Sequence, residues 1–313
     1  MKKIHFSDIE NLLGKSYKVL GADFVPFTKI RPIFEADEDA ITWINPARKD
    51  KDQLLNQTKA RLIICDSDLF FQNHLDQKCF LIVENPKAVF TRILRTFFED
   101  KMEYPVGIHP TAIISQDAKI HPSVHVGAFC IIDKCEIGEG SIILPYTRIH
   151  RDVFIGNNVK INEYCNIGGD GFGHIWNEDN LIEKMPHIGK VIIEDDVEIL
   201  QFVNIDKGTL HLTHIKKGAI LDHYVHIGHN ATVGEYTMIG AKAVFCGGSS
   251  VGHNCFVGIQ TIILDAVKVG NEVLVGAGSV VTKPIPDGQK WTGSPAIELN
   301  KFKEQQKEKI KKV

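Results

Sequence analysis

The segment LDHYVHIGHNATVG, residues 221 to 234, holds the histidine whose position best suits chemistry. Large apolar residues recur at every sixth position here, and His229 occupies the third place of the hexad that begins at Ile227. That place points away from an apolar interior. A solvent-facing imidazole changes charge near neutral pH, so it suits a general base that takes a proton from an attacking amine or hydroxyl. The alternative is that His229 is an exposed corner histidine without a function.

A glycine stands where an oxyanion donor is needed. If three hexads make one turn, the residue one turn above His229 is eighteen positions further, which is Gly247 in FCGGSS. Its backbone N–H could bind a developing oxyanion because no side chain obstructs it. A base and an oxyanion donor on adjacent turns are what acyl transfer from a thioester requires. No covalent enzyme nucleophile is needed.

A metal site is the competing hypothesis for this histidine-rich region. The histidines in question are His211, His214, His223, His226 and His229. Zinc needs three or four convergent ligands. In the hexad register His223 and His229 occupy the same place on different faces, so one chain would not bring them together. We therefore predict no metal.

These positions depend on a repeat of six residues. From Ile215 to Val281 a large apolar residue stands at every sixth position, and a small or β-branched residue follows four places later in every complete hexad. The period is neither the two of an ordinary strand nor the 3.6 of a helix. It is typical of a parallel β-helix, in which each hexad supplies one short strand and one corner. The large residue would point into the prism and the small one would fit the corner.

The same register appears earlier in the chain. It runs from Ile108 to Ile132, slips by one residue, continues from Ile137 to Ile167, and returns from Ile193 to Ile205. Gly, Asn and Asp between the large residues predict corners with unusual backbone angles. The coils should stack through main-chain hydrogen bonds and nearest-neighbour packing.

Two insertions interrupt the repeat, at residues 168–187 and 211–214. Insertions in a solenoid are extruded as loops, and loops on a rigid scaffold often carry function. Several glycine N–H groups in the first insertion could turn toward an anion, although a tolerated surface excursion remains the alternative. The candidate ligand-binding residues there are Gly169, Asp170, Gly171, Phe172 and Gly173.

Residues 1–104 lack hexads and predict a compact α/β domain. Apolar runs at 41–45, 60–66 and 79–85 indicate strands, and Asn85 followed by Pro86 indicates the start of a helix. That helix would bury an i, i+3, i+4 stripe made of Val89, Phe90, Ile93, Leu94, Phe97 and Phe98. The β-helix would span 105–286, and 287–313 would form a short charged helix or tail.

Composition narrows the class of protein. The 313 residues carry 36 Lys and Arg against 39 Asp and Glu, so no global field would attract nucleic acid. Seven cysteines are odd in number and never spaced as C-x-x-C, which predicts reduced, mostly buried thiols in a cytoplasmic protein. No signal peptide and no apolar run of membrane-spanning length is visible, so we expect neither secretion nor an integral membrane segment.

The segments that together carry a family resemblance are ITWINP, NPKAVFTRIL, IGGDGFG, LDHYVHIGHN and the closing GAGSVVTKPIPDGQKWTGSPA. With these segments, the chain resembles the UDP-3-O-acylglucosamine N-acyltransferases of lipid A synthesis. The resemblance covers roughly residues 1 to 300. It implies a mainly β protein, with a left-handed parallel β-helix behind an N-terminal uridine-binding α/β domain. It also implies a homotrimer with active sites between neighbouring subunits.

The resemblance also implies an activity and a set of residues. The activity is transfer of a 3-hydroxyacyl chain from the phosphopantetheine arm of acyl carrier protein to the amine of a UDP-3-O-acyl-glucosamine, with no permanently bound cofactor. His229 matches the family's base and Gly247 its oxyanion glycine. Asp222 and Asn230 lie in the matching segment, and we expect Asp222 to orient the imidazole and favour its protonated form.

The N-terminal domain and the chain's end depart from the family pattern. Trp43 and Asn45 would hold the nucleobase, but Arg48 stands where the family has an aromatic residue, Ala266 where it has a second histidine, and the C-terminal extension is short. A second hypothesis is therefore an N-acyltransferase or N-acetyltransferase that uses acyl-CoA on another 3- or 4-amino-sugar nucleotide, for O-antigen, capsule or glycan synthesis. A catalytically silent solenoid used for assembly is the third.

Overall fold

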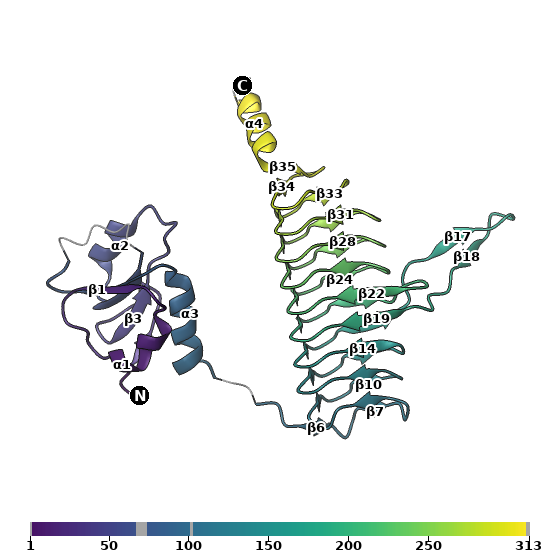
Figure 1. The fold of residues 1–313 in the computed structure, drawn as a ribbon, viewed down its shortest axis with the longest axis horizontal. Coiled ribbons are helices and arrows are strands. Elements are labelled where there is room, and N and C mark those ends of the chain that lie inside the picture. The colour runs from purple at the N-terminus through teal and green to yellow at the C-terminus, as the bar shows by residue number, and fades with distance from the viewer. Residues whose placement is uncertain (1, 67–73, 101–102, 311–313) are drawn as a thin grey trace. The chain divides into compact units, whose positions relative to one another are not determined.

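The structure is a computed structural model that describes residues 2–66, 74–100 and 103–310. The chain divides into two compact units, bounded at Glu103 and Tyr104. The first is an α/β unit and the second is a solenoid of short strands (Figure 1).

The N-terminal unit contains a five-stranded sheet in the order β1-β5-β4-β3-β2, with β1 antiparallel to β5 and the other pairs parallel. The three predicted strands are confirmed as β3, β4 and β5. The elements of this unit are α1 (Phe6–Ile9), the 3-10 helix η1 (Glu10–Leu12), β1 (Tyr17–Gly21), β2 (Lys29–Ile30), β3 (Ala40–Trp43), α2 (Lys51–Gln57), β4 (Leu62–Cys65), β5 (Cys79–Val83) and α3 (Pro86–Phe97).

Helix α3 begins where the sequence predicts. The side chain of Asn85 accepts a hydrogen bond from the backbone N–H of Ala88, and Pro86 occupies the first turn. The buried stripe is narrower than expected. Val89 and Ile93 are buried and Phe90 and Phe98 pack against the same core, whereas Leu94 and Phe97 stay 39% and 36% exposed.

The solenoid is a parallel β-helix with three sheets, which we number in chain order. Among the described residues the first sheet has eleven strands, the second nine and the third eight. The first contains β6 (Gly107–Ile108), β9 (His125–Val126), β12 (Ile142–Ile143), β15 (Lys160–Ile161), β20 (Glu198–Ile199), β23 (Ile220–Leu221), β26 (Met238–Ile239), β29 (Phe256–Val257), β32 (Leu274–Val275), β34 (Lys290–Thr292) and β35 (Ile297–Glu298). The second contains β7 (Ile113–Ile114), β10 (Ile131–Ile132), β13 (Arg148–Ile149), β16 (Asn166–Gly169), β21 (Asn204–Asp206), β24 (His226–Ile227), β27 (Val244–Phe245), β30 (Ile262–Ile263) and β33 (Val280–Val281). The third contains β8 (Lys119–Ile120), β11 (Glu136–Ile137), β14 (Val153–Ile155), β19 (Lys190–Ile193), β22 (Leu212–Ile215), β25 (Thr232–Val233), β28 (Ser250–Val251) and β31 (Lys268–Val269).

Strand register explains every irregularity of the repeat. Ile227 pairs with Phe245, eighteen positions further, which is one regular coil. The partner of Ile132 is only seventeen positions further, at the one-residue slip. Ile161 pairs with Ile199 across the long insertion, and Ile205 pairs with Ile227 across the four-residue insertion. The long insertion is therefore extruded without breaking the stack. The expectation that residues 211–214 form an extruded loop is wrong, because Leu212–Ile215 is strand β22, which pairs with β19, and the extra length lies between β21 and β22.

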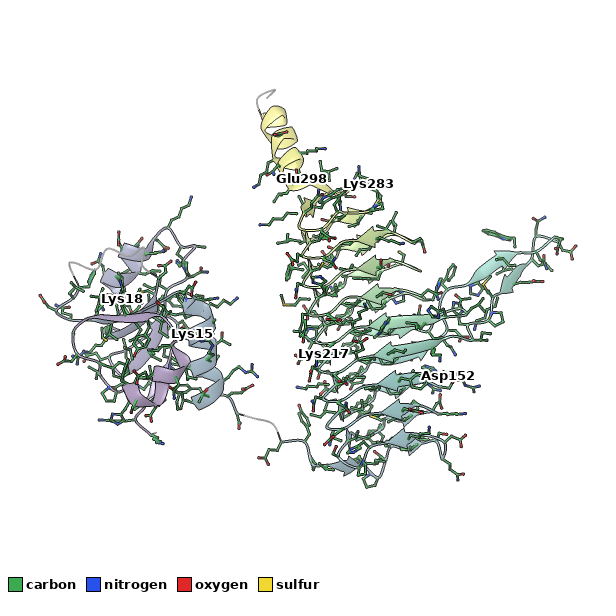
Figure 2. All side chains as sticks on the ribbon, in the orientation of Figure 1. Lys15, Lys18, Asp152, Lys217, Lys283 and Glu298 are labelled. Carbon is green, nitrogen blue, oxygen red and sulfur yellow. The ribbon has the colours of Figure 1, made fainter. Side chains whose placement is uncertain are left out.

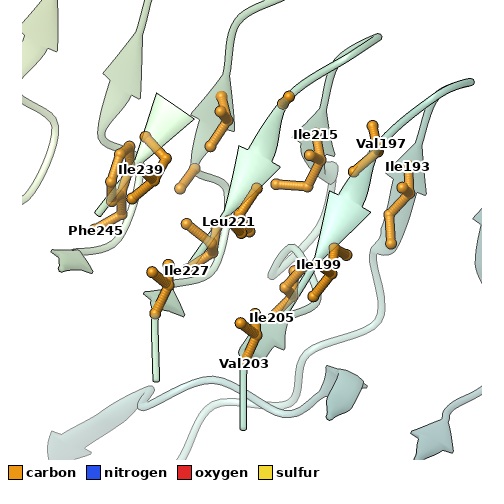
Figure 3. Close-up of a cluster of buried hydrophobic side chains, with 14 of the residues drawn as sticks. Ile193, Val197, Ile199, Val203, Ile205, Ile215, Leu221, Ile227, Ile239 and Phe245 are labelled. Carbon is orange, nitrogen blue, oxygen red and sulfur yellow. The ribbon is translucent and has the colours of Figure 1, made fainter. Parts of the chain in front are cut away.

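The large hexad residues form the solenoid core, as predicted. All twelve from Ile215 to Val281 are buried, with at most 4% exposure, and Figure 3 shows part of this column. The small residues four places later are buried too. The first coil is the exception: Ile108 is 48% exposed and Ile114 and Ile120 are only partly buried, because β6, β7 and β8 are the end strands of their sheets.

One corner differs from the expectation of Gly, Asn and Asp. Between the first and second sheets, five aromatic residues adopt left-handed backbone angles with φ between 58° and 63°. Their rings stack from coil to coil with centroids 4.8 to 5.2 Å apart, and each stays 44% to 52% exposed. We call this set the aromatic ladder: Phe129, Tyr146, Tyr164, Phe202 and Tyr224. Stacking from coil to coil offsets the cost of the left-handed conformation for a bulky side chain.

The long insertion forms a hairpin of β17 (His174–Trp176) and β18 (Ile182–Lys184), which projects from the coils (Figure 1). Its side chains extend clear of the solenoid (Figure 2). At the other end, the strands continue past residue 286, because β34 pairs with β32 and β35 folds back on β34. Helix α4 (Leu299–Ile310) follows.

Core packing predicts unequal costs for two neighbours in β19. Ile193 points into the prism and is 1% exposed, whereas Ile192 points outward and is partly exposed. We expect Ile193→Ala to lower the free energy of unfolding by about 2–5 kcal/mol through lost burial and a residual cavity. The matched variant Ile192→Ala should cost less than about 1 kcal/mol. Urea unfolding followed by circular dichroism measures both, and equal losses would contradict the assigned register.

Candidate active site

His229 lies half-buried at the corner between the second and third sheets, directly after β24. The Asn230 side-chain oxygen accepts a hydrogen bond from the backbone N–H of Thr209 at 3.1 Å, and the Nδ1 of His229 lies 3.1 Å from the same oxygen. The hydrogen bond from Thr209 identifies the Asn230 atom as the amide oxygen, which can only accept. The His229 ring must therefore donate to it through Nδ1–H. The lone pair of His229 is then on Nε2, where a general base needs it.

Gly247 is placed against this nitrogen, on the next coil. A Cβ atom added to Gly247 would lie 2.6 Å from Nε2 and 2.6 Å from Cε1 of His229. Only glycine therefore leaves the imidazole its position. The carbonyl of Gly247 accepts from the N–H of Ala266, while its own N–H donates to no group in the part of the chain that the structure describes. The pair predicted from the eighteen-residue spacing is thus adjacent in space.

The start of the long insertion folds over His229. Gly171 is buried, and a Cβ there would lie 3.1 Å from the His229 ring and 3.0 Å from Nε2 of His187. A Cβ at Gly173 would lie 2.7 Å from the His187 ring. These two glycines therefore let the backbone approach both histidines. Phe172, between them, is 84% exposed.

Asp170 ties the hairpin to the solenoid. Its carboxylate pairs with Lys184 of β18 at 2.5 Å and with Lys207, which is almost fully buried beside β21, at 3.4 Å. The hydrogen bond from Lys184 lowers the pKa of the Asp170 carboxyl, and Lys207 acts in the same direction. Gly169 lies at the end of β16, opposite Asp206, and its carbonyl accepts from the N–H of Lys207.

The expectation that Asp222 orients His229 does not hold within the chain. Asp222 accepts from the backbone N–H of its neighbour His223 and lies 2.6 Å from the Nδ1 of that residue. Its second oxygen accepts from the N–H of Ala241. Asp222 belongs to the corner between the first and second sheets, one corner before His229. The side chain that orients His229 is Asn230.

A buried polar cluster under the site was not identified from the sequence. Asp206 is 6% exposed and accepts a hydrogen bond from the side chain of Asn204 at 2.7 Å, while the His226 Nε2 lies 3.7 Å away. Burial raises the pKa of the Asp206 carboxyl, against the opposing effects of the Asn204 amide and of His226, His229 and His187. The sequence did contain an indication of this cluster. Polar residues occupy the same hexad place in three successive coils and pair in register, so they form a polar column on the second sheet: Asn166, Asn204 and His226.

The histidines proposed as an alternative metal site do not converge. His214 pairs with Glu194 at 2.7 Å and His223 with Asp222, on different faces. Among the described residues, no group of three or more His, Cys, Asp or Glu side chains is close enough to hold a metal ion.

The N-terminal candidates lie where β3 ends. Trp43 is half-buried, with its ring 5.9 Å from that of Phe90 in α3. Asn45 is exposed and accepts from the backbone N–H of Ala47. Arg48 forms an ion pair with Asp50 at 2.6 Å.

Comparison with known proteins identifies the family. The family described as "Bacterial transferase hexapeptide (six repeats)" matches residues 212–247. A UDP-3-O-acylglucosamine N-acyltransferase from Pseudomonas syringae pv. syringae is 30% identical over 257 residues, which cover 73% of this chain and 70% of that protein. One from Coxiella burnetii is 31% identical over 242 residues, 70% of this chain and 68% of that protein.

The chain belongs to the UDP-3-O-acylglucosamine N-acyltransferase family. A further member, from Pseudomonas syringae pv. tomato, is 34% identical, and there the match spans about half the length of each protein, 51% of both.

Solved structures agree on the fold of this family member. UDP-N-acetylglucosamine O-acyltransferase from Moraxella catarrhalis superposes with a TM-score of 0.55 at 24% identity, over 64% of this chain and 77% of that one. The UDP-N-acetylglucosamine acyltransferase from Campylobacter jejuni gives 0.55 at 24%, over 61% and 73%. The predicted fold, a left-handed parallel β-helix in a mainly β protein, is confirmed.

The ion pairs of Asp170 predict how the insertion is held. We expect Asp170→Asn to increase hydrogen exchange in β17 and β18, because Lys184 and Lys207 lose their shared carboxylate. Unfolding stability should fall by less than about 1 kcal/mol, because the carboxylate is 41% exposed. Mass spectrometry of hydrogen exchange at neutral pH measures the first effect. Unchanged exchange in the hairpin would show that other contacts hold it.

Proposed function

We propose that this protein transfers an acyl group from a thioester to the amine of a nucleotide-linked amino sugar. The preferred reaction takes a 3-hydroxyacyl chain from acyl carrier protein to UDP-3-O-acyl-glucosamine, as the names of its relatives suggest. The observation that carries the proposal is the placement of Gly247 against the Nε2 of His229. The chemistry would belong to the cytoplasm, where acylated carrier proteins are made.

The proposed chemical step uses the imidazole of His229 and the backbone N–H of Gly247. The Nε2 lone pair of His229 takes a proton as the substrate amine attacks the thioester carbonyl. A C–N bond forms, and the oxyanion accepts a hydrogen bond from the N–H of Gly247. The C–S bond then breaks, and the thiolate leaves with the proton that His229 returns. Asn230 fixes the tautomer that makes Nε2 the base.

The donor arm would be phosphopantetheine, with no cofactor bound permanently. Gly169 to Gly173 would contact the sugar-phosphate part of the acceptor through their backbone. Asp170 would contribute indirectly, because its carboxylate already pairs with two lysines. In the N-terminal unit, Trp43 and Asn45 would bind the uracil base.

A second candidate uses acyl-CoA and another amino-sugar nucleotide. Two observations favour it. Arg48 is held by Asp50 and offers no aromatic face to a base. Ala266, above Gly248 at the catalytic corner, offers no titratable group to the donor.

We also propose that the protein works as a homotrimer. The aromatic ladder is exposed along one corner, and the first sheet beside it presents Met238, Phe256 and Leu274 at 47%, 45% and 38% exposure. Large contiguous apolar surfaces mark sites of association. A second copy of the chain would cover this corner.

Among the helices that the structure describes, none has the length and apolar character to cross a bilayer.

The first test crosses donors with acceptors. Purified protein is incubated with 3-hydroxyacyl carrier protein or acetyl-CoA, and with UDP-3-O-(3-hydroxyacyl)-glucosamine or a panel of 3- and 4-amino-sugar nucleotides. We expect product only from the carrier-bound donor with the UDP-glucosamine acceptor, measured by mass spectrometry. Product only from acetyl-CoA with another amino sugar would establish the second candidate. No product from any pair would favour a silent scaffold.

The base is tested with a matched pair of histidines. His253 lies in a second Gly-His-Asn sequence at the same hexad place, exposed on another corner. We expect His229→Ala to lower kcat by about 10²–10⁴-fold. His253→Ala should leave kcat within about twofold. Equal rates for wild type and His229→Ala, with the fold intact by circular dichroism, would remove His229 from the mechanism.

The proposed homotrimer is tested by placing charged side chains in the aromatic ladder. Aspartate tolerates left-handed backbone angles, so Tyr164→Asp with Phe202→Asp should keep the coil and place charge in the interface. Light scattering after gel filtration should then give one 35.0 kDa chain in place of three. The control Phe154→Asp, on the outer face of the third sheet, should leave the trimer intact. A monomeric wild type would refute the assembly.

A further inference from the structure

Asp206 is a buried carboxyl that the mechanism above does not use. It ends β21, and its hydrogen-bond partner is the neutral amide of Asn204. A buried carboxylate is costly unless cations compensate it. Its neighbour Lys207 does not, because the Lys207 ammonium pairs with Asp170, which also holds Lys184.

Three histidines from separate parts of the fold compensate this carboxyl instead. His226 comes from β24, His229 from the corner that follows, and His187 from the end of the long insertion. The Nε2 of His226 is 3.7 Å from the second oxygen of Asp206. Because Ile205 pairs with Ile227, Asp206 lies one coil below Gly228, the residue before His229. All three histidines favour the charged carboxylate. The cluster therefore links the base to a negative charge that solvent does not screen.

His187 shows that the cluster is kept at a cost. It is 4% exposed, and within the described residues neither ring nitrogen has a hydrogen-bond partner. Its ring meets that of His229 edge-on, with centroids 5.2 Å apart. A buried polar atom without a partner costs about 1–3 kcal/mol. A buried histidine that packs on the base at this cost is expected at a functional centre.

We propose that Asp206 is a positioning residue that stabilises the protonated form of His229 during acyl transfer. This rests on the proposed function. When the amine's proton reaches Nε2, a positive charge appears beside His187 and His226, which disfavour it if they are charged. The Asp206 carboxylate offsets that charge in a site of low dielectric constant.

Two other carboxyls lie near this corner. Asp222 cannot act, because its oxygens are bound to His223 and Ala241. Asp265 lies on the far side of Gly247, with its Oδ1 3.3 Å from where a Cβ of Gly247 would stand, but it is exposed, so solvent screens its charge.

The test is Asp206→Asn, which keeps the acceptor oxygen for Asn204 and removes the charge. We expect kcat/KM to fall about 10- to 100-fold, and the acidic limb of the pH–rate profile to move about 0.5–1 unit to lower pH, because the imidazolium loses its counter-charge. Asp133→Asn is the control. It removes a carboxylate paired with Arg148 outside the cluster and should change neither value.

A second variant tests the proposal even where Asp206→Asn does not fold. His226 is 41% exposed, so His226→Gln should fold. Without His226, the Asp206 carboxylate stabilises the protonated form of His229 more strongly. The acidic limb of the pH–rate profile should therefore move to higher pH, the opposite direction from Asp206→Asn. A profile unchanged in both variants would overturn the proposal.

One further readout separates this proposal from the proposed function. NMR titration of ¹³C-labelled histidine in the full chain follows the His229 ring without substrate. The pH at which its signals change should fall in Asp206→Asn and rise in His226→Gln. Acyl transfer by wild type with unchanged titrations in both variants would refute the role of Asp206 alone. An inactive wild type with shifted titrations would refute the proposed function and keep the cluster.

Discussion

The stacking of one coil on the next is the constraint on which the rest of this structure depends. Main-chain hydrogen bonds between coils place each residue over the residue one turn earlier, and the inward column of large apolar side chains fixes which residues those are. A shift by one residue would turn every outward side chain into the core. His229 and Gly247 meet because both obey this register.

The candidate active site is built where the regular stack is interrupted. The long insertion brings Gly171 and His187 against His229, and the connection between β21 and β22 supplies Thr209, which fixes the orientation of Asn230. The regular coils thus hold the proposed base and the proposed oxyanion donor, while the irregular segments complete their surroundings. Glycine is required where backbone approaches an imidazole, since any Cβ would meet the ring.

Charge is distributed unevenly around this corner. Asp170 is neutralised by two lysines and serves to hold the hairpin, and Asp222 is engaged by its neighbour. Asp206 accepts a hydrogen bond from the neutral amide of Asn204, and the titratable groups that act on it are histidines. The outer face of the second sheet is therefore polar beneath the base and apolar above it, where Val244, Ile262 and Val280 follow His226 in register.

Sequence alone determined the β-helix, the existence of two interruptions and the meeting of His229 with Gly247, because a period of six with an eighteen-residue turn is a local rule that each coil repeats. Tertiary structure decided the rest. The ion pairs of Asp170 and the cluster of Asp206 with His187 depend on how a twenty-residue insertion folds back, which no periodicity encodes. Asp222 is engaged by its own neighbour His223 and by the N–H of Ala241, a side-chain choice that the repeat does not fix. The aromatic ladder shows the same limit: side-chain stacking between coils made left-handed corners acceptable for rings that propensity alone would exclude.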